Sequence, residues 1–222
     1  MRRPLGLAPC LIVLAAVAPS AWSDCPTTTY VVYPTPIVTY GSVHDTTYSY
    51  PSGTARGRYH VGAGQIGAES QWTAALYTVH EDDFTVIGIA PGTPFTLSAT
   101  ARFTGRVTSV GAPSSGDGAI IAGRLSDALG HEVATGASVG ETGDYTLDHT
   151  ITLTVVGTAG TPFRLRFSAE TYSTLAFATI QGALSFVGLP AGASVISCRG
   201  YSSALPVPVR TATWGAIKTR YR

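Results

Sequence analysis

The sequence contains no asparagine, and glutamine occurs at only three of its 222 positions. N-glycosylation requires an Asn-x-Ser/Thr acceptor, so the missing asparagine excludes this modification. Side-chain amides both donate and accept hydrogen bonds, which suits them to sugar hydroxyls. Their scarcity therefore argues against a polar groove for carbohydrate.

A long hydrophobic run is also missing. The apolar segment Leu11–Ala18 is shorter than the roughly 20 residues that a transmembrane helix needs. It follows two basic residues, Arg2 and Arg3, and precedes the small-residue pattern Ala21–Ser23. This order is typical of a secretory signal peptide, residues 1–23, with cleavage before Asp24. We expect a secreted or cell-surface protein that keeps no integral membrane segment once the signal is removed.

An excess of basic residues is likewise missing from the mature chain. Removal of the signal leaves 12 basic and 13 acidic side chains. Four of the basic residues lie in the last 13 positions, namely Arg210, Lys218, Arg220 and Arg222. The rest of the chain is therefore mildly acidic. Nucleic acid is excluded as an expected partner, because its phosphates require a basic surface.

Cysteine is scarce, and the three that occur have different expected roles. Cys10 leaves with the signal peptide, so Cys25 and Cys198 remain in the mature chain. An even count in an oxidising compartment predicts a disulfide between these two. The chain-entropy model gives such a bridge a contribution of about 5 kcal/mol, as an upper figure. Two free or intermolecular thiols are the alternative.

The first mature segment, residues 24–55, is rich in Thr, Tyr and Pro. Thr and Tyr favour extended backbone, whereas Pro34 and Pro36 exclude a central strand. We interpret the segment as an extended arm or edge strand that lies on the following domain. The alternative is a surface of aromatic side chains that binds a ligand.

Within residues 56–201, apolar and polar residues alternate in four runs: 95–103, 145–155, 163–169 and 180–186. Successive side chains of a strand point to opposite faces, so each run predicts a strand with one buried face. Glycine-rich turns separate the runs, and no segment shows helical spacing over ten residues. The pattern predicts an all-β fold, an antiparallel two-sheet β-sandwich of the jelly-roll or immunoglobulin-like type.

The tetrapeptide Gly-Thr-Pro-Phe occurs twice, at residues 92–95 and 160–163. Proline fixes φ and cannot donate to a strand ladder, so it belongs at a strand's first residue. Each Phe is then expected to be the first inward side chain of a core strand. We interpret the repeat as architectural, marking corresponding places in the two sheets.

Three stretches carry a family resemblance: GRYHVGAGQIGAES (57–70), DDFTVIGIAPGTPFTLSATARFTG (82–105) and LSFVGLPAGASVISCRGY (184–201). In order and spacing they resemble the secreted bacterial β-sandwich domains of PEP-CTERM surface proteins, over roughly residues 56–201. The resemblance implies an exported protein of the cell surface or matrix, and it carries no catalytic motif. The chain departs from that family at its end, because no Pro-Glu-Pro, apolar helix and basic cluster close it.

These observations favour a non-catalytic exported protein with a structural or interaction role at the bacterial cell surface or in the extracellular matrix. A carbohydrate-binding module is the alternative. Its candidate ligand-facing aromatics are Trp72 and Tyr77, whose flat rings could stack on sugars unless they pack in the core or on a sheet face.

A secreted hydrolase is the more distant alternative. The sequence GASVG, residues 136–140, fits the nucleophile elbow with Ser138 as nucleophile. An elbow requires a strand-turn-helix, whereas a turn and an alternating strand follow here. Asp148 and His149 are adjacent, so on a strand they point to opposite faces and cannot pair. GAGQIG, residues 62–67, fits a dinucleotide fingerprint but is followed by strand pattern where a helix is required.

No cofactor is expected, with calcium as a weak candidate. Glu81, Asp82 and Asp83 form the densest acidic cluster, and carboxylates are ligands of this hard cation. A solvated strand edge is the simpler interpretation. The histidines show no metal-ligand spacing.

The chain ends in a proline-containing linker, residues 202–210, and a basic aromatic tail, residues 211–222. In a short helix Trp214, Ile217 and Tyr221 would share one face. Ten residues cannot hold an isolated helix, so this face is expected to dock on an unidentified surface or matrix partner. Packing on its own domain is the alternative.

Overall fold

The computed structural model describes residues 28–32, 35–39, 43–109, 118–140 and 143–203. They form eleven strands and one 3₁₀ turn: β1 Thr28–Val32, β2 Thr35–Thr39, β3 Val43–Tyr50, β4 Gly53–His60, η1 Val61–Ala63, β5 Gln65–Ile87, β6 Pro94–Ser109, β7 Gly118–Asp127, β8 Glu132–Val139, β9 Gly143–Thr158, β10 Phe163–Val187 and β11 Ser194–Ser197. Within this part of the chain, no helix has the length and apolar character needed to cross a membrane. The predicted signal peptide, Cys25 and the tail residues Trp214, Ile217 and Tyr221 lie outside it.

The predicted alternation sets which side of each strand is buried. In β6, Phe95 and every second residue up to Phe103 are buried, whereas the residues between them are more exposed. In β9, Leu147, Ile151, Leu153 and Val155 are buried and the intervening threonines are exposed. All strand pairs are antiparallel. The prediction of an all-β antiparallel sandwich is confirmed.

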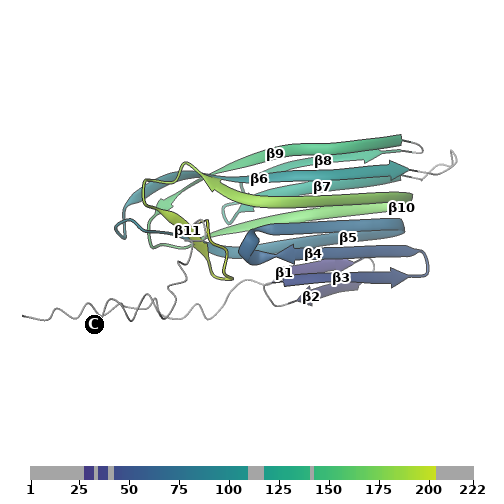
Figure 1. The fold of residues 1–222 in the computed structure, drawn as a ribbon, viewed down its shortest axis with the longest axis horizontal. Coiled ribbons are helices and arrows are strands. Elements are labelled where there is room, and N and C mark those ends of the chain that lie inside the picture. The colour runs from purple at the N-terminus through teal and green to yellow at the C-terminus, as the bar shows by residue number, and fades with distance from the viewer. Residues whose placement is uncertain (1–27, 33–34, 40–42, 110–117, 141–142, 204–222) are drawn as a thin grey trace, which may run out of the picture.

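The strands form two layers, and the long strands β5 and β10 run through both (Figure 1). Layer I has the order β3-β4-β5-β10-β6-β9 and uses residues 65–72 of β5 and 176–187 of β10. Layer II has the order β2-β1-β5-β10-β7-β8 and uses residues 74–87 of β5 and 163–174 of β10. β11 pairs with the end of β5 along the same edge as β1.

Both long strands pass from one layer to the other at the end of the sandwich drawn on the right in Figure 1. Trp72 and Leu175 take left-handed backbone there, with φ of 64° and 50°. Ser52 holds the bend of β5, because its carbonyl oxygen accepts from the N–H of Thr73 (2.9 Å) and its hydroxyl donates to the carbonyl of Thr73 (3.1 Å). The two halves of β5 then face each other across the interior.

Aromatic rings fill the space between the layers. Phe103 of layer I and Phe167 of layer II are buried, with ring centroids 5.3 Å apart. Phe84 and Phe186 meet in the same way, also at 5.3 Å. A methyl group on Gly182 would lie 2.6 Å from Cζ of Phe167 and 2.7 Å from Cε1 of Phe103. Only glycine leaves room at this position for both rings.

The repeated Gly-Thr-Pro-Phe motif starts one strand in each layer, as the sequence predicts. β6 begins at Pro94 in layer I, and β10 begins at Phe163 in layer II. The two glycines, Gly92 and Gly160, have φ of 83° and 82°, which glycine adopts without strain. The rings of Phe95 and Phe163 lie 6.0 Å apart, so the two copies of the motif contact each other across the layers.

The Thr/Tyr/Pro-rich segment contributes regular strands to both layers. β2 lies at the edge of layer II and contains Pro36, which is consistent with proline's missing N–H. β3 pairs with β4 in layer I, and its Tyr48 and Tyr50 pack on the core. Of the two interpretations, extended arm or edge strand, the described residues of the segment form strands at the edges of the sandwich.

Candidate binding site

The three glutamines of the chain lie on one surface, the outer face of layer I. Gln65 and Gln71 belong to β5 and Gln181 belongs to β10. All three are exposed, whereas their neighbours Ile66 and Ile180 are buried. The pairing of β5 with β10 places Gln181 opposite Gly67, so Gln65 and Gln181 are diagonal neighbours on adjacent strands. The tertiary structure thus concentrates a side chain that is rare in the sequence.

A depression of about 510 Å³ lies on this outer face. Its volume falls within the range of small-molecule sites, roughly 300–1,000 Å³. Arg58, Gly67 and Gln181 follow one another across β4, β5 and β10. Because Gly67 has no side chain, the sheet is open at this point. The polar side chains that line the depression are Asp45, Arg58, His60, Gln65, Arg102, Thr104 and Gln181.

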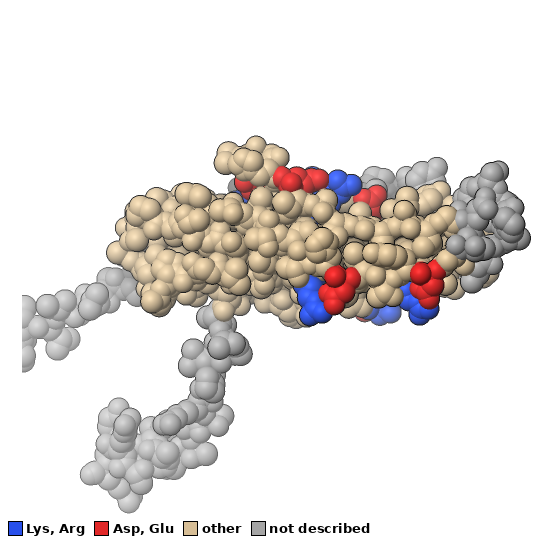
Figure 2. Space-filling view, turned by 90° about the horizontal axis from the view of Figure 1, so that it is seen from above, with Lys and Arg blue, Asp and Glu red and all other residues tan. Residues whose placement is uncertain are grey.

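Most arginines of this face bind a carboxylate through two hydrogen bonds: Arg56 to Asp45, Arg102 to Asp148 and Arg106 to Asp144. These hydrogen bonds lower the pKa of Asp45, Asp144 and Asp148. Figure 2 views the molecule from above, onto the edge where β8 and β9 lie, and shows blue groups beside red groups and wide areas without charge.

Arg58 differs from these arginines. Its guanidinium lies over Gly67, since a methyl group there would be 3.5 Å from Nε and 3.7 Å from Nη2 of Arg58. Asp45 is opposite Arg58 in the strand pair, but both of its oxygens accept from Arg56 at 2.7 Å. Among the residues that the structure describes, no carboxylate forms an ion pair with Arg58. Its donors are available in the middle of the depression.

Two histidines support the same region. The ring of His44 stacks on Tyr59 at 5.6 Å, and burial lowers the pKa of His44, which keeps the ring neutral at pH 7. His60 accepts a hydrogen bond from the N–H of Ala63 through Nδ1 (3.0 Å) and thereby holds η1. After η1, Gly64 leads into β5, so the second half of GAGQIG already belongs to a strand and no helix follows it.

The structure places Trp72 and Tyr77 on different surfaces. Trp72 lies at the bend of β5, with about half of its surface exposed. Tyr77 points outward from layer II, beside a groove of about 220 Å³. The guanidinium of Arg166 lies over the Tyr77 ring at 5.7 Å and donates to its hydroxyl at 3.0 Å. The two aromatics do not form a common platform, and Arg166 covers one face of Tyr77.

Ser138 and His149 also lie on different sides. Ser138 is exposed on the outer face of layer II, whereas His149 points between the layers and bonds Thr135 through Nδ1 (2.9 Å). Asp148 points outward from the opposite side of its strand, to Arg102. The adjacent residues thus face opposite ways, as predicted, and the hydrolase hypothesis gains no Ser-His-Asp geometry from these residues.

The three carboxylates at residues 81–83 do not converge. Glu81 and Asp83 lie on the outer side of β5, where Arg164 pairs with both, at 3.7 Å and 2.8 Å. Asp82 points inward and is fully buried. Within the described residues, no three metal-binding side chains are grouped as a metal site would require.

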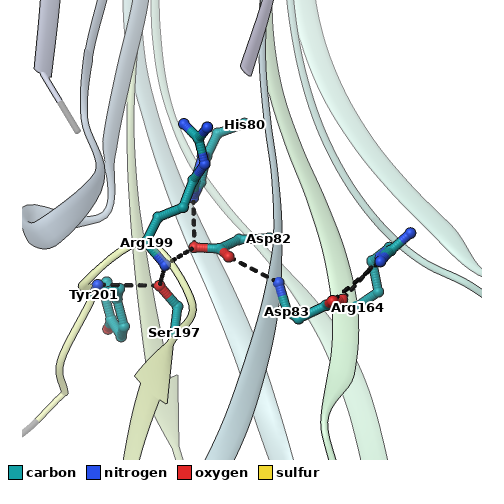
Figure 3. Close-up of polar contacts among 7 residues, drawn as sticks. All are labelled: His80, Asp82, Asp83, Arg164, Ser197, Arg199 and Tyr201. Atoms are coloured by element: carbon teal, nitrogen blue, oxygen red, sulfur yellow. Dashed lines mark hydrogen bonds and ion pairs between the residues drawn. The ribbon is translucent and has the colours of Figure 1, made fainter. Parts of the chain in front are cut away.

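Asp82 belongs to a buried polar cluster that joins β5 to the segment after β11 (Figure 3). Its oxygens accept from the N–H groups of Asp83 (2.9 Å) and Arg199 (3.3 Å), and Nε2 of His80 lies 3.6 Å away. Burial raises the pKa of Asp82 to about 6 and lowers the pKa of His80 to about 4. Ser197 accepts from the N–H of Tyr201 at 3.1 Å. Asp82, His80 and Ser197 are buried, so the cluster joins the end of β5 to the segment after β11 inside the fold.

Sequence reasoning missed Arg58, Gln65 and Gln181 as candidate site residues. Each stands at an outward position of an alternating strand, and that much is visible in the sequence. Their proximity depends on the pairing of β4 with β5 and of β5 with β10. The prediction against a polar groove was based on composition and did not account for this pairing.

No protein-family model matches the chain, and no curated protein sequence matches it. Among solved structures, it is similar to TmCBM61, a carbohydrate-binding module solved with β-1,4-galactotriose: TM-score 0.29, 9% identity, 72% of this chain and 86% of that one. It is also similar to a family 16 carbohydrate-binding module, with a TM-score of 0.15 and 17% identity, over 66% of this chain and 86% of that one. A third similar structure is the enzymatically active domain of a bacteriophage CBA120 tailspike protein, with a TM-score of 0.23 and 11% identity, over 65% of this chain and 19% of that one. Likenesses of this strength establish neither fold nor function.

Proposed function

We propose that the protein is a non-catalytic, exported binding module that holds a carbohydrate chain in the depression of layer I. One observation carries the proposal: two of the three glutamines and the open guanidinium of Arg58 line the same depression of about 510 Å³. Amide, guanidinium and hydroxyl groups in one shallow site match the alternating donors and acceptors of sugar hydroxyls.

The extent of the depression supports a chain ligand. The lining residues come from the neighbouring strands β3, β4, β5, β10 and β6, so the depression crosses several strands. A site built on paired strands is already ordered before the ligand binds, which lowers the entropic cost of association. The binding is proposed as non-catalytic because the Ser138 and His149 side chains point away from one another.

Gln181→Leu tests the glycan-binding proposal. Because the lost amide forms hydrogen bonds with the ligand, we expect affinity to fall roughly three- to tenfold. Gln71→Leu is the matched control, since Gln71 is exposed on the same face but does not line the depression. Binding is measured by titration calorimetry against the ligands selected on a glycan array. Equal losses in the two variants, or no glycan bound at all, would contradict the proposal.

Export is the second part of the proposal, and it is linked to the predicted disulfide. The intact mass of the protein recovered outside the cell should correspond to a chain that begins at Asp24. It should also be lower by two hydrogens than that of the reduced form, with Cys25 and Cys198 in one linked peptide. A full-length mass, or two thiols that react with iodoacetamide in the folded protein, would reject these assignments.

An interaction role through the bend end is a second candidate function. Trp72 and Leu175 are 50% and 42% exposed, although left-handed backbone costs a bulky residue on the order of 1–3 kcal/mol. Glycine at these positions would avoid this cost. The presence of large side chains there therefore points to a role for the side chains themselves. If Trp72→Ala removes binding to isolated cell-surface material and Gln181→Leu does not, this candidate replaces the glycan module.

A further inference from the structure

The depression of layer I contains an arginine whose position is unusual for this surface. Arg56, Arg102 and Arg106 each donate two hydrogen bonds, from Nε and Nη2, to a carboxylate of the protein. Arg58 lines the depression, and it forms no ion pair with a carboxylate of the described residues. The surface pattern therefore leaves one guanidinium without the partner that the others have.

The neighbouring acids do not supply that partner. Asp45 lies opposite Arg58, and the charge of Arg58 helps to lower its pKa, but both of its oxygens accept from Arg56 and it forms no ion pair with Arg58. Glu69 lies on the same face of β5, two residues after Gly67, and is the strand partner of Arg56. The residue directly beside Arg58 on β5 is Gly67, which leaves the guanidinium open toward the depression.

We infer that the depression selects an anionic glycan, with Arg58 binding the carboxylate of a uronic acid residue. A planar guanidinium matches a carboxylate through two parallel hydrogen bonds. Gln65 lies diagonally beside it on β5, and Gln181 follows in the same row on β10, beyond Gly67; both amides can bind the ring hydroxyls of the same or the next sugar. Thr104, opposite Gln181, adds a hydroxyl. The inference rests on the proposed glycan-binding function and specifies its ligand class.

A carboxylate is the favoured anion over a sulfate ester. Arg102 also lines the depression, but it is engaged by Asp148 at 2.9 Å and 2.7 Å. One available guanidinium therefore faces one anionic group. This arrangement suits a single charge per sugar and gives no cluster of cations for the more densely charged sulfated glycans.

The test compares matched ligands and matched variants of the whole mature protein. The probes are polygalacturonate and polymannuronate, each beside its carboxyl-reduced, neutral counterpart, together with a sulfated glycan, dextran sulfate. The variants are Arg58→Gln, Arg58→Lys and, as a control on the same face, Arg106→Gln. Arg106 lies outside the depression, so its replacement removes the same charge elsewhere. Thermal melting shows whether each variant is folded.

We expect at least one polyuronate to bind roughly tenfold or more tightly than its reduced form. Arg58→Gln should abolish that difference, Arg58→Lys should keep only part of it, and Arg106→Gln should retain it. Equal binding of charged and reduced glycans, unaffected by Arg58→Gln, would overturn the inference and leave glycan binding intact. Preference for dextran sulfate would overturn the carboxylate assignment. No binding to any glycan would overturn the proposed function as well.

Discussion

Asp82→Asn is expected to make the protein less stable as the pH falls from 7 to 4, whereas His80→Gln is expected to have the opposite effect. Both side chains lie in the interior, 3.6 Å apart, in the cluster that holds the segment after β11. Burial raises the pKa of Asp82 from 3.8 to about 6 and lowers the pKa of His80 from 6.5 to about 4. The two groups therefore act on stability in opposite directions over the same pH range.

The signs follow from proton linkage. The folded protein binds the Asp82 proton more tightly than the unfolded chain, so this contribution is complete below pH 3.8 and is lost as the pH rises through 6. The folded protein binds the His80 proton more weakly, so this contribution is present above pH 6.5 and is lost as the pH falls through 4. Each amounts to about 3 kcal/mol at 1.36 kcal/mol for each pKa unit. In the wild type they largely cancel.

Urea unfolding at pH 7 and pH 4 measures these effects. The change in unfolding free energy between the two pH values is compared between Asp82→Asn and His80→Gln, because the surface groups that titrate are the same in both variants. We expect Asp82→Asn to lose about 3 kcal/mol more than wild type on acidification and His80→Gln to lose less or to gain. Parallel pH profiles for the two variants would show that the pair does not titrate as burial dictates.

Phe167→Ala is expected to lower the unfolding free energy by about 3–5 kcal/mol. Phe167 is buried, and its ring meets Phe103 of the other layer at 5.3 Å beside Gly182. The loss consists of apolar area exposed to water and of a cavity that strands paired on both sides cannot collapse to fill. It is a large part of the roughly 5–15 kcal/mol by which domains are stable.

Tyr172→Ala is the matched control for this prediction. Tyr172 lies on the same strand but points outward and is 47% exposed. Its removal should cost less than about 1 kcal/mol, as exposed substitutions usually do. Both variants are compared with wild type by urea unfolding followed by circular dichroism. If Phe167→Ala costs no more than Tyr172→Ala, the ring packing between the layers is not a main source of stability.

The strands and their buried faces could be predicted because each depends on local sequence. Phe95 to Phe103 alternate with polar residues, and β6 buries that alternation as expected. Asp148 and His149 had to face opposite ways on any strand, and they do. The bends at Trp72 and Leu175 could not be predicted, because neither residue favours left-handed backbone and only packing of the layers imposes it.

The strand class, the turns at Gly92 and Gly160, and the outward side of each strand follow from the amino-acid pattern, because these properties depend on neighbours within a few residues. The tertiary structure alone decided that β5 and β10 each join both layers and that Arg58, Gln65 and Gln181 meet around Gly67. Pairing between distant strands is selected by the packing of the whole core, and a shift by one residue would turn every outward side chain inward. Local pattern therefore specifies the faces, and the long-range register specifies the candidate site.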